Sequence, residues 1–199
     1  MLIRPSDATS DEAQWRSFVH QQGFGHFAVN SVGQPVLVPT QFVLLDDQVI
    51  FHLAKSNPVF AALEVTAKAV LSVAGDWAYI PGAWKAIGDE DPSMGVPTTY
   101  YGAVQLIGTV TVTDEPDEIA AILRTQLSEL EPDSGLQDPM VHLKRFATIR
   151  GLRMTLDDVR AKFKYGGNVD AEHRDAAAER LRERGGPGDH AAADRVPRG

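Results

Sequence analysis

The stretch from Phe24 to Val112 constrains the fold most, because it consists of short segments of strand character separated by turn residues. Phe24–Val29, Pro35–Leu44 and Val49–Leu53 are rich in apolar and β-branched residues, and the short spacers between them are typical of tight turns. We predict that these three segments form an antiparallel meander. Several such strands with few helices among them favour a barrel over a sandwich, so we predict a mainly β fold with flanking helices.

Three further strands are expected beyond the meander, at 69–73, 78–80 and 99–112. The last is long, and Gly108 within it indicates a bulge or a sharp bend. The segment 82–97 between the second and the third is rich in Gly, Pro and acidic residues. We therefore predict that this segment is a loop.

Amphipathic patterns predict helices on both sides of the strand region. A first short helix, which Thr9 or Ser10 can cap and Gly23 ends, precedes the strands. After the long strand, helices are expected at 116–130, 140–149 and 170–184, and strands at 153–156 and 159–165. From Gly185 the composition indicates a disordered tail. We therefore expect one domain over 1–169, followed over 170–199 by a C-terminal helix and a flexible tail.

Charge and composition argue against several classes of function. The 199 residues include 19 Lys and Arg against 27 Asp and Glu, a net charge of −8, which disfavours a basic face for DNA or for an anionic membrane. Cysteine is absent and the six His have no paired ligand spacing, so we expect no metal site. No apolar run approaches the length of a membrane span and no secretory signal is evident. We expect a soluble, cytoplasmic protein.

The segment HLAKSNP at 52–58 is the most informative one for chemistry, because it lies where a strand ends and a helix begins. Asn57 suits the cap and Pro58 the first helical position, which would leave backbone N–H groups open to an anion. Lys55 adds a positive charge, Ser56 adds a hydroxyl and His52 could add an N–H. These donors suit a phosphate group. A capped helix with an exposed lysine and no ligand is the alternative, and on spacing alone it is the more common case.

The aromatic segment WAYIPGAW at 77–84 lies at the junction of a strand and a loop. Trp77, Tyr79 and Trp84 could stack against a flat aromatic ligand. The alternative is that they close one end of the barrel as part of its core.

Two more segments carry polar side chains that could meet a ligand. In VPTTYYGAVQLIG at 96–108, Thr98 and Gln105 could reach polar groups of a ligand, although an ordinary strand start has the same composition. The lysines and paired glycines of KFKYGGN at 162–168 form a local basic segment, which an exposed strand end also explains.

In their order and spacing, these four segments resemble the PaiB-type family of FMN-binding negative transcriptional regulators, within the pyridoxamine phosphate oxidase superfamily. The likeness spans about residues 1–175. It implies an FMN-binding split β-barrel with flanking helices, and a homodimer with two FMN sites at the subunit interface. It also implies either flavin chemistry of the oxidoreductase type on an unknown small-molecule substrate or a flavin-linked regulatory role.

The resemblance also implies which residues contact FMN. Lys55, Ser56 and Asn57 would hold the phosphate, with His52 nearby. The strand residues along the isoalloxazine would be Val38, Pro39, Thr40 and Gln41, and the other pocket residues would be Trp77, Tyr79, Trp84, Thr98 and Gln105. The segment 162–168 would close over the site.

The chain departs from the family pattern in three places. A stretch of Thr-His-Leu-Pro type reads Val38-Pro39-Thr40-Gln41 here, so a family histidine is missing and no catalytic base is assigned. Thr99 and Tyr100 replace a family Trp-Asn, which indicates different contacts on the substrate side. Lys55 and Ser56 replace Arg-Ala, keeping the charge and adding a donor.

Other functions stay open at this point. A relative could bind the deazaflavin F420 or haem, or the barrel could have lost its cofactor and act as a binding module. Direct DNA binding by a repressor would need the basic residues to cluster, although no recognition helix is evident. These basic residues are Arg145, Arg150, Lys162 and Lys164.

Overall fold

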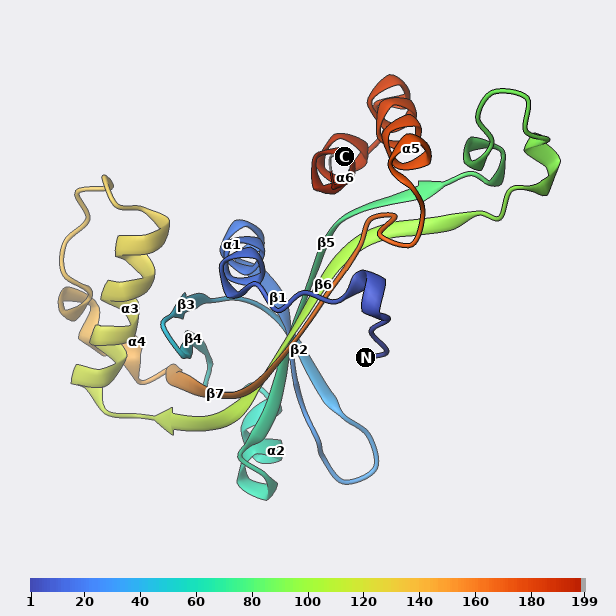
Figure 1. Cartoon of the computed structure of the whole chain (residues 1–199). Coiled ribbons are helices and arrows are strands. Elements are labelled where there is room, and N and C mark those ends of the chain that lie inside the picture. The colour runs from blue at the N-terminus through green and yellow to red at the C-terminus, as the bar shows by residue number, and fades with distance from the viewer. Residues whose placement is uncertain (198–199) are drawn as a thin grey trace. The chain divides into compact units, whose positions relative to one another are not determined.

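A computed structural model describes residues 1–197 as a seven-stranded sheet with six α-helices (Figure 1). The strands are β1 (Phe24–Val29), β2 (Val36–Gln41), β3 (Val43–Leu45), β4 (Gln48–Ala54), β5 (Lys68–Ile80), β6 (Thr98–Thr113) and β7 (Ile149–Lys164). The helices are α1 (Glu12–Gln22), α2 (Val59–Val65), α3 (Pro116–Leu130), α4 (Leu143–Phe146), α5 (Ala171–Arg184) and α6 (Asp189–Arg195). Antiparallel strands follow the order β2-β1-β5-β6-β7-β4-β3, and the sheet does not close. The predicted class, mainly β with flanking helices, is confirmed.

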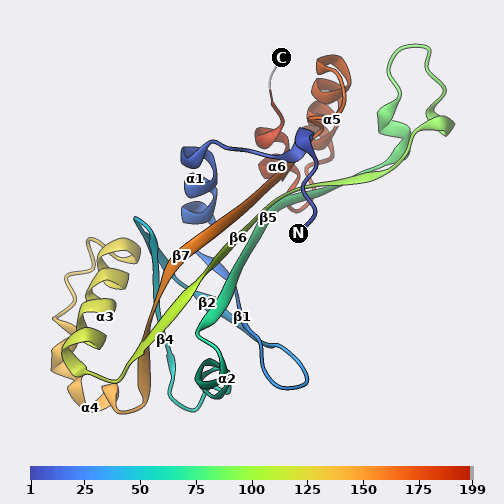
Figure 2. The same ribbon diagram turned by 60° about the horizontal axis from the view of Figure 1, so that its bottom comes forward.

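The chain divides into two compact units. The first unit comprises 1–18, 74–104 and 161–199, and the second comprises 19–73 and 105–160. The first unit has a buried cluster in which side chains of β5 and β6 meet those of α5 and α6. In the second unit, α3 packs on β4 and α2 packs beside β1 and β2 (Figures 1 and 2). Each unit therefore has an interior of its own. The predicted boundary after residue 169 stays a prediction.

The predicted meander is wrong in its second strand, because the segment 35–44 forms two strands instead of one. β2 pairs with β1, so that Val38 lies opposite Phe27, whereas β3 pairs with β4. Phe42 stands between them, buried, with its N–H bonded to the carbonyl of Gly23 (3.3 Å). No Gly or Pro lies between Gln41 and Val43, where the chain changes its partner, so the sequence gives no turn signal at this point.

Two pairs of predicted short strands are each one continuous strand. The segments at 69–73 and 78–80 belong to β5, within which Asp76 has a left-handed backbone (φ 49°). The segments at 153–156 and 159–165 belong to β7, whose Asp157 pairs with Lys68 (2.7 Å) and accepts a hydrogen bond from Thr109 (3.0 Å). Asp76 and Asp157, which lie in the gaps between the predicted segments, are therefore accommodated within continuous strands.

Glycine at position 108 permits a close approach between two strands of the second unit. A Cβ atom on Gly108 would collide with the carbonyl oxygen of Thr155 on β7. Any larger residue would push β6 away from β7, which explains why a residue that usually weakens strands occurs here.

A helix before Gly23 and a helix at 116–130 form as the sequence predicts, but the cap of the first one differs and another predicted helix is absent. Asp11, and not Thr9 or Ser10, caps α1, because its Oδ1 accepts the N–H groups of Ala13 (2.9 Å) and Gln14 (3.3 Å). The helix predicted at 140–149 is wrong. A 3-10 turn (Pro139–His142) and the four-residue α4 take its place, because the chain from Ile149 onward pairs with β4.

The disordered tail predicted from Gly185 is also wrong over residues 185–197, and the last two residues of that prediction lie outside the described residues. Gly185 ends α5 in a left-handed conformation (φ 59°), and α6 follows and packs on α5. Ala192 and Ala193 of α6 are buried, and Arg184 donates to the buried carboxylate of Asp189 (2.7 Å). Small apolar residues that resemble a low-complexity tail thus supply a close helix contact. Within residues 1–197, no helix is both long enough and apolar enough to cross a membrane.

Candidate cofactor site

The junction between β4 and α2 carries the three neighbouring side chains predicted to hold a phosphate group. Lys55 and Ser56 lie exposed directly after β4. The Asn57 side-chain oxygen accepts the N–H of Val59 (3.1 Å), so its amide nitrogen remains a donor. The helix starts at Val59 with Pro58 as its cap residue, one position later than predicted, and has only seven residues. Side-chain donors, more than a helix dipole, therefore define this junction.

Two cations meet at one carboxylate beside this junction. The Lys55 ammonium lies 3.0 Å from Oδ1 of Asp114, and Nε of Arg150 donates to the same oxygen at 3.0 Å. The Arg150 guanidinium also stacks over the ring of Phe60, at 5.0 Å from its centroid. The hydrogen bond from Lys55, together with Arg150, lowers the pKa of Asp114. Two positive charges against one negative leave a net positive site, which fits a phosphate dianion.

The strand predicted to lie along the cofactor ring is β2, an outer strand of the sheet. Its residues Val38 to Gln41 pair only with β1, with Pro39 opposite His26 and Thr40 opposite Gly25. Thr40 is buried and its hydroxyl donates to the carbonyl of Gln41 (3.0 Å). One backbone edge of β2 is outside the sheet ladder and can bind a ligand's polar edge. Because α2 contacts β2, this strand and the Lys55 junction belong to one region of the second unit.

His52 lies on the wall of a cavity of about 760 Å³ in the second unit. Its Nδ1 is 2.7 Å from Oε1 of Gln126 on α3. An amide oxygen only accepts hydrogen bonds, so Nδ1 is the donor in this pair, and in the neutral ring the lone pair is then on Nε2. The lining residues include Gln41, His52, Leu123, Gln126, His142 and Phe146. The structure thus brings two of the predicted residues, Gln41 and His52, to one cavity.

Gln126 is a site residue that sequence reasoning missed. It falls on the same helical face as Ile119, Ile122 and Leu123, and it is buried. A polar side chain on an otherwise apolar face indicates a hydrogen-bond partner in the core, since burying an unpaired amide is costly. That signal was present in the sequence, although it does not identify His52 as the partner.

Replacing Gln126 tests whether it fixes the His52 ring. Gln126→Leu is expected to let His52 populate both neutral tautomers and to lower the free energy of unfolding by about 1 kcal/mol, because one buried hydrogen bond is lost. Ring ¹⁵N chemical shifts report the tautomer, and urea denaturation reports the stability. A variant whose His52 ring keeps a single tautomer would show that another group holds the proton.

The remaining predicted residues fall into two groups. Gln105 belongs to the second unit, and Trp77, Tyr79, Trp84 and Thr98 belong to the first. Trp77 and Tyr79 are 58% and 50% exposed. Trp84 packs against the buried cluster of the first unit, with the Arg184 guanidinium 4.7 Å from its ring centroid.

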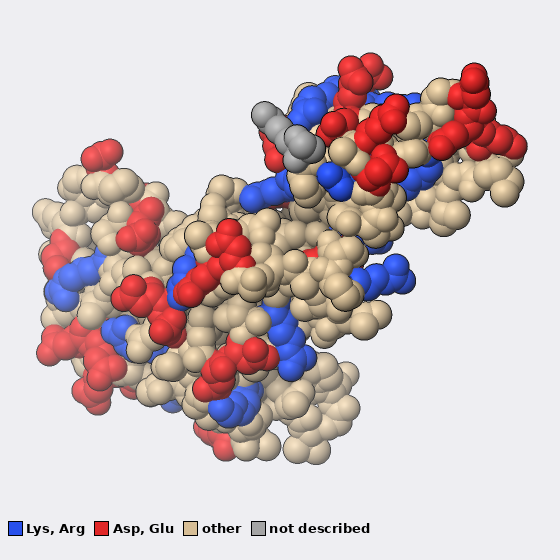
Figure 3. Space-filling model, in the orientation of Figure 1, with Lys and Arg blue, Asp and Glu red and all other residues tan. Residues whose placement is uncertain are grey.

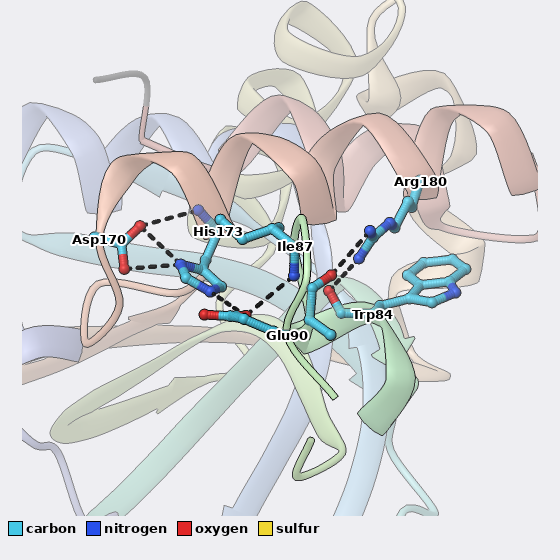
Figure 4. A network of polar contacts seen from close by, with 7 residues as sticks. Trp84, Ile87, Glu90, Asp170, His173 and Arg180 are labelled. Atoms are coloured by element: carbon cyan, nitrogen blue, oxygen red, sulfur yellow. Dashed lines mark hydrogen bonds and ion pairs between the residues drawn. The ribbon is translucent and has the colours of Figure 1, made fainter. Parts of the chain in front are cut away.

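A polar network connects the loop after β5 to the start of α5 in the first unit (Figure 4). His173 Nδ1 lies 2.8 Å from Asp170, and its Nε2 lies 3.0 Å from Glu90. The hydrogen bond to Asp170 and, to a smaller extent, the one to Glu90 raise the pKa of His173. The hydrogen bond from His173 lowers the pKa of Asp170 to about 2 and also lowers the pKa of Glu90. Asp170 also caps α5, accepting the N–H of His173 (3.0 Å).

This network is expected to make the order of the loop depend on pH. The pKa of His173 is raised above its ordinary 6.5 in the folded protein. The stability that His173 gives to the loop is therefore complete below pH 6.5 and is lost as the pH rises through the pKa of the folded state. The lowered pKa of Asp170 matters at acidic pH. The stability that the Asp170 carboxylate gives to the loop is present above pH 3.8 and is lost as the pH falls toward about 2. The hydrogen-exchange protection factor of Ile87, whose N–H donates to Glu90 (3.1 Å), should therefore fall from about pH 5 to about pH 9.

Two variants, a test and a control, check this expectation. His173→Gln should make the protection of Ile87 independent of pH in that range. His20→Gln, which changes an exposed histidine on α1, should leave the pH dependence as it is. Equal protection of Ile87 at both pH values in the unmodified protein would contradict the role of the network.

The open sheet with its flanking helices is the fold of a flavin-binding split barrel. Residues 1–161 match the family described as "Putative FMN-binding domain". Since this match covers most of the chain, the protein belongs to that family, and FMN is its cofactor.

Solved structures share the fold at low sequence identity. The flavocytochrome Anf3 from Azotobacter vinelandii is 20% identical, with a TM-score of 0.65 over 84% of this chain and 73% of that one. An FAD and heme binding protein from Mycobacterium smegmatis is 20% identical, with a TM-score of 0.66 over 86% and 80%. No curated protein matches the sequence.

Proposed function

We propose that this protein is a flavoprotein of the oxidoreductase type that holds the FMN phosphate at Lys55, Ser56 and Asn57, with help from Arg150. The observation that carries this proposal is the convergence of Lys55 and Arg150 on one oxygen of Asp114, beside exposed donors. A phosphate bound there would meet two cations and several N–H or O–H donors, which is the pattern that charge-assisted recognition of a phosphate uses.

The flavin ring would lie along the open edge of β2, from Val38 to Gln41, where backbone groups can meet its polar edge. Bound FMN supplies electron transfer, and the protein supplies binding, orientation and electrostatics. The cavity wall with His52 would be close to this region. Trp77, Tyr79, Trp84, Thr98 and Gln105 complete the proposed set of flavin-site residues, and no catalytic base is assigned.

The protein is proposed to act as a homodimer in the cytoplasm. Support for the dimer comes from Trp77 and Tyr79. These two large side chains lie two positions apart on β5, and both are about half exposed. Aromatic side chains on a surface often mark an interface. Size-exclusion chromatography with light scattering gives the mass directly, and a monomer at micromolar concentration would contradict this part of the proposal.

The absorption spectrum of the protein as purified is the primary test. A flavin spectrum is expected, or, for protein purified without cofactor, quenching of FMN fluorescence on titration. Riboflavin, which lacks the phosphate, should bind more weakly than FMN. A colourless protein that leaves FMN fluorescence unchanged would refute the proposal, and a deazaflavin spectrum would replace FMN by F420.

Haem is a second candidate ligand, in the cavity of the second unit. The names of both structural relatives include haem or a cytochrome. Here Gln126 accepts a hydrogen bond from Nδ1 of His52, which in the neutral ring leaves Nε2 to ligate a metal, and a hydrogen bond to the other ring nitrogen is common among metal-ligating histidines. Apolar side chains such as Leu123 and Phe146 line the same cavity. A Soret band that appears on haem titration and is lost in His52→Ala would support this role, and its absence would exclude it.

A regulatory role of the PaiB type would be compatible with flavin binding, but direct DNA binding has less support. Arg150 is paired with Asp114, and Lys162 lies 3.8 Å from Asp7. Figure 3 shows acidic side chains interspersed among the basic ones on the visible face. An electrophoretic mobility shift that weakens steeply with salt would support DNA binding, and no shift at low salt would exclude it.

A further inference from the structure

A second cavity, in the first unit, has a volume of about 350 Å³ and a basic lining. It is formed by the N-terminal segment, the loop before β6, the start of β6 and the end of β7. The side chains that matter for its chemistry are Arg4, Lys85, Thr98, Tyr100, Lys164 and Asn168. Its volume is at the lower end of the range for small-molecule sites.

Positive charge in this cavity exceeds negative charge. Arg4, Lys85 and Lys164 line it, and Asp7 is the one carboxylate among its lining residues in the part of the chain described. Asp7 is buried, and its charge is balanced by Lys162, whose ammonium lies 3.8 Å away. Burial, and then the charge of Lys164, lower the pKa of Lys85. Two ammonium groups that repel each other in this way would be stabilised by an anion between them.

A buried hydroxyl without a partner lies on the wall of the same cavity. Tyr100 is 1% exposed, and among residues 1–197 its hydroxyl has no hydrogen-bond partner. That hydroxyl lies beside Gly166, another lining residue, because a Cβ atom there would be 2.5 Å from it. Buried polar groups nearly always have partners, so this donor indicates a missing acceptor.

Thr98 adds a further donor. Its hydroxyl oxygen accepts a hydrogen bond from Lys164 (2.7 Å), which leaves the hydroxyl proton for another acceptor. The Lys85 ammonium lies 5.6 Å from the centroid of the Tyr100 ring, so the cation, the phenol and the Lys164–Thr98 pair surround one space. The apolar lining residues Val96 and Val169 can contact the carbon part of a ligand.

We propose that this cavity binds a small organic oxyanion, a phosphate monoester or a carboxylate, and that its anion-binding side chains differ from Lys55, Ser56 and Asn57, which are proposed for the flavin phosphate; Thr98 is proposed for both ligands. The lysines and Arg4 neutralise the charge, and the Tyr100 and Thr98 hydroxyls donate to its oxygens. The volume exceeds that of an oxyanion alone, so the ligand carries an organic body. This inference does not depend on the identity of the flavin.

Titration calorimetry with inorganic phosphate, and separately with acetate, on the cofactor-loaded protein at constant ionic strength tests the proposal. One of the two anions should bind with saturation in a chloride background, and which one binds identifies the oxyanion class. Tyr100→Phe and Lys164→Ala should each weaken this binding about 10-fold. The control Lys144→Ala removes an exposed lysine of the second unit and should change nothing.

Tyr100→Phe separates a ligand-binding role from a structural one. Because its hydroxyl makes no hydrogen bond within the described chain, the variant should unfold at the same temperature or higher while losing anion affinity. Saturation no stronger than that of chloride, or unchanged affinity in both variants, would overturn the proposal. So would a loss of FMN affinity in both variants together with competition between phosphate and FMN, because the cavity would then hold the flavin phosphate.

Discussion

Lys55→Ala is expected to weaken FMN binding about 10- to 100-fold and to leave riboflavin binding nearly unchanged. The ammonium of Lys55 lies 3.0 Å from Asp114, in a group that carries one more positive charge than negative. Removing it leaves Arg150 to neutralise Asp114, so the site loses its excess charge and a charge-assisted donor for the phosphate. Fluorescence titration with both flavins measures the effect, since riboflavin has the ring without the phosphate.

The ratio of the affinities for FMN and for riboflavin makes this test specific for the phosphate. Lys144→Ala, an exposed lysine in the same unit, should leave both affinities unchanged. A parallel loss of FMN and riboflavin binding in Lys55→Ala would indicate damage to the ring site instead. If both affinities stay as they are, the phosphate lies elsewhere and the assignment of Ser56 and Asn57 fails with it.

Phe51→Ala is expected to lower the free energy of unfolding by about 3–5 kcal/mol. Phe51 is fully buried on β4, and its ring meets that of Phe27 edge to face, with the centroids 5.0 Å apart. Truncation removes the apolar contact and leaves a cavity between two strands of the second unit. Urea denaturation followed by circular dichroism measures the change.

A matched truncation on the surface of the same unit provides the control. Leu37→Ala, on β2, where the side chain is 58% exposed, should change the stability by no more than about 0.5 kcal/mol. Because Phe51 immediately precedes His52, Phe51→Ala should also weaken flavin binding at 37 °C. A stability loss below about 1 kcal/mol would show that the core of this unit is not packed as described.

Local patterns predicted those elements whose signals lie within one stretch of sequence. β1 and α3 form over the residues predicted, since alternation and helical periodicity are local properties. The division between β2 and β3 was missed because it depends on which strand each half pairs with. β5 and β7 are longer than predicted for the same reason: partners distant in sequence, such as Lys68 for Asp157, allow a strand to continue through acidic residues.

The same distinction holds for the candidate site. Lys55, Ser56 and Asn57 are consecutive, so their convergence at a strand end could be predicted from their order alone. Asp114 and Arg150 come from other strand ends, and no local motif connects them to Lys55. The placement of Tyr100 in a basic cavity likewise depends on how β6 and the end of β7 meet within the first unit.

The packing of α6 has a practical consequence for work on this protein. A designer who judged the last fifteen residues dispensable would end the chain near Gly185 and so remove the helix that covers Ala178 and Leu181. The newly exposed apolar surface would promote aggregation, and this aggregation could be mistaken for a failure to bind cofactor. Expression of all 199 residues, with any affinity tag at the N-terminus, avoids this artefact.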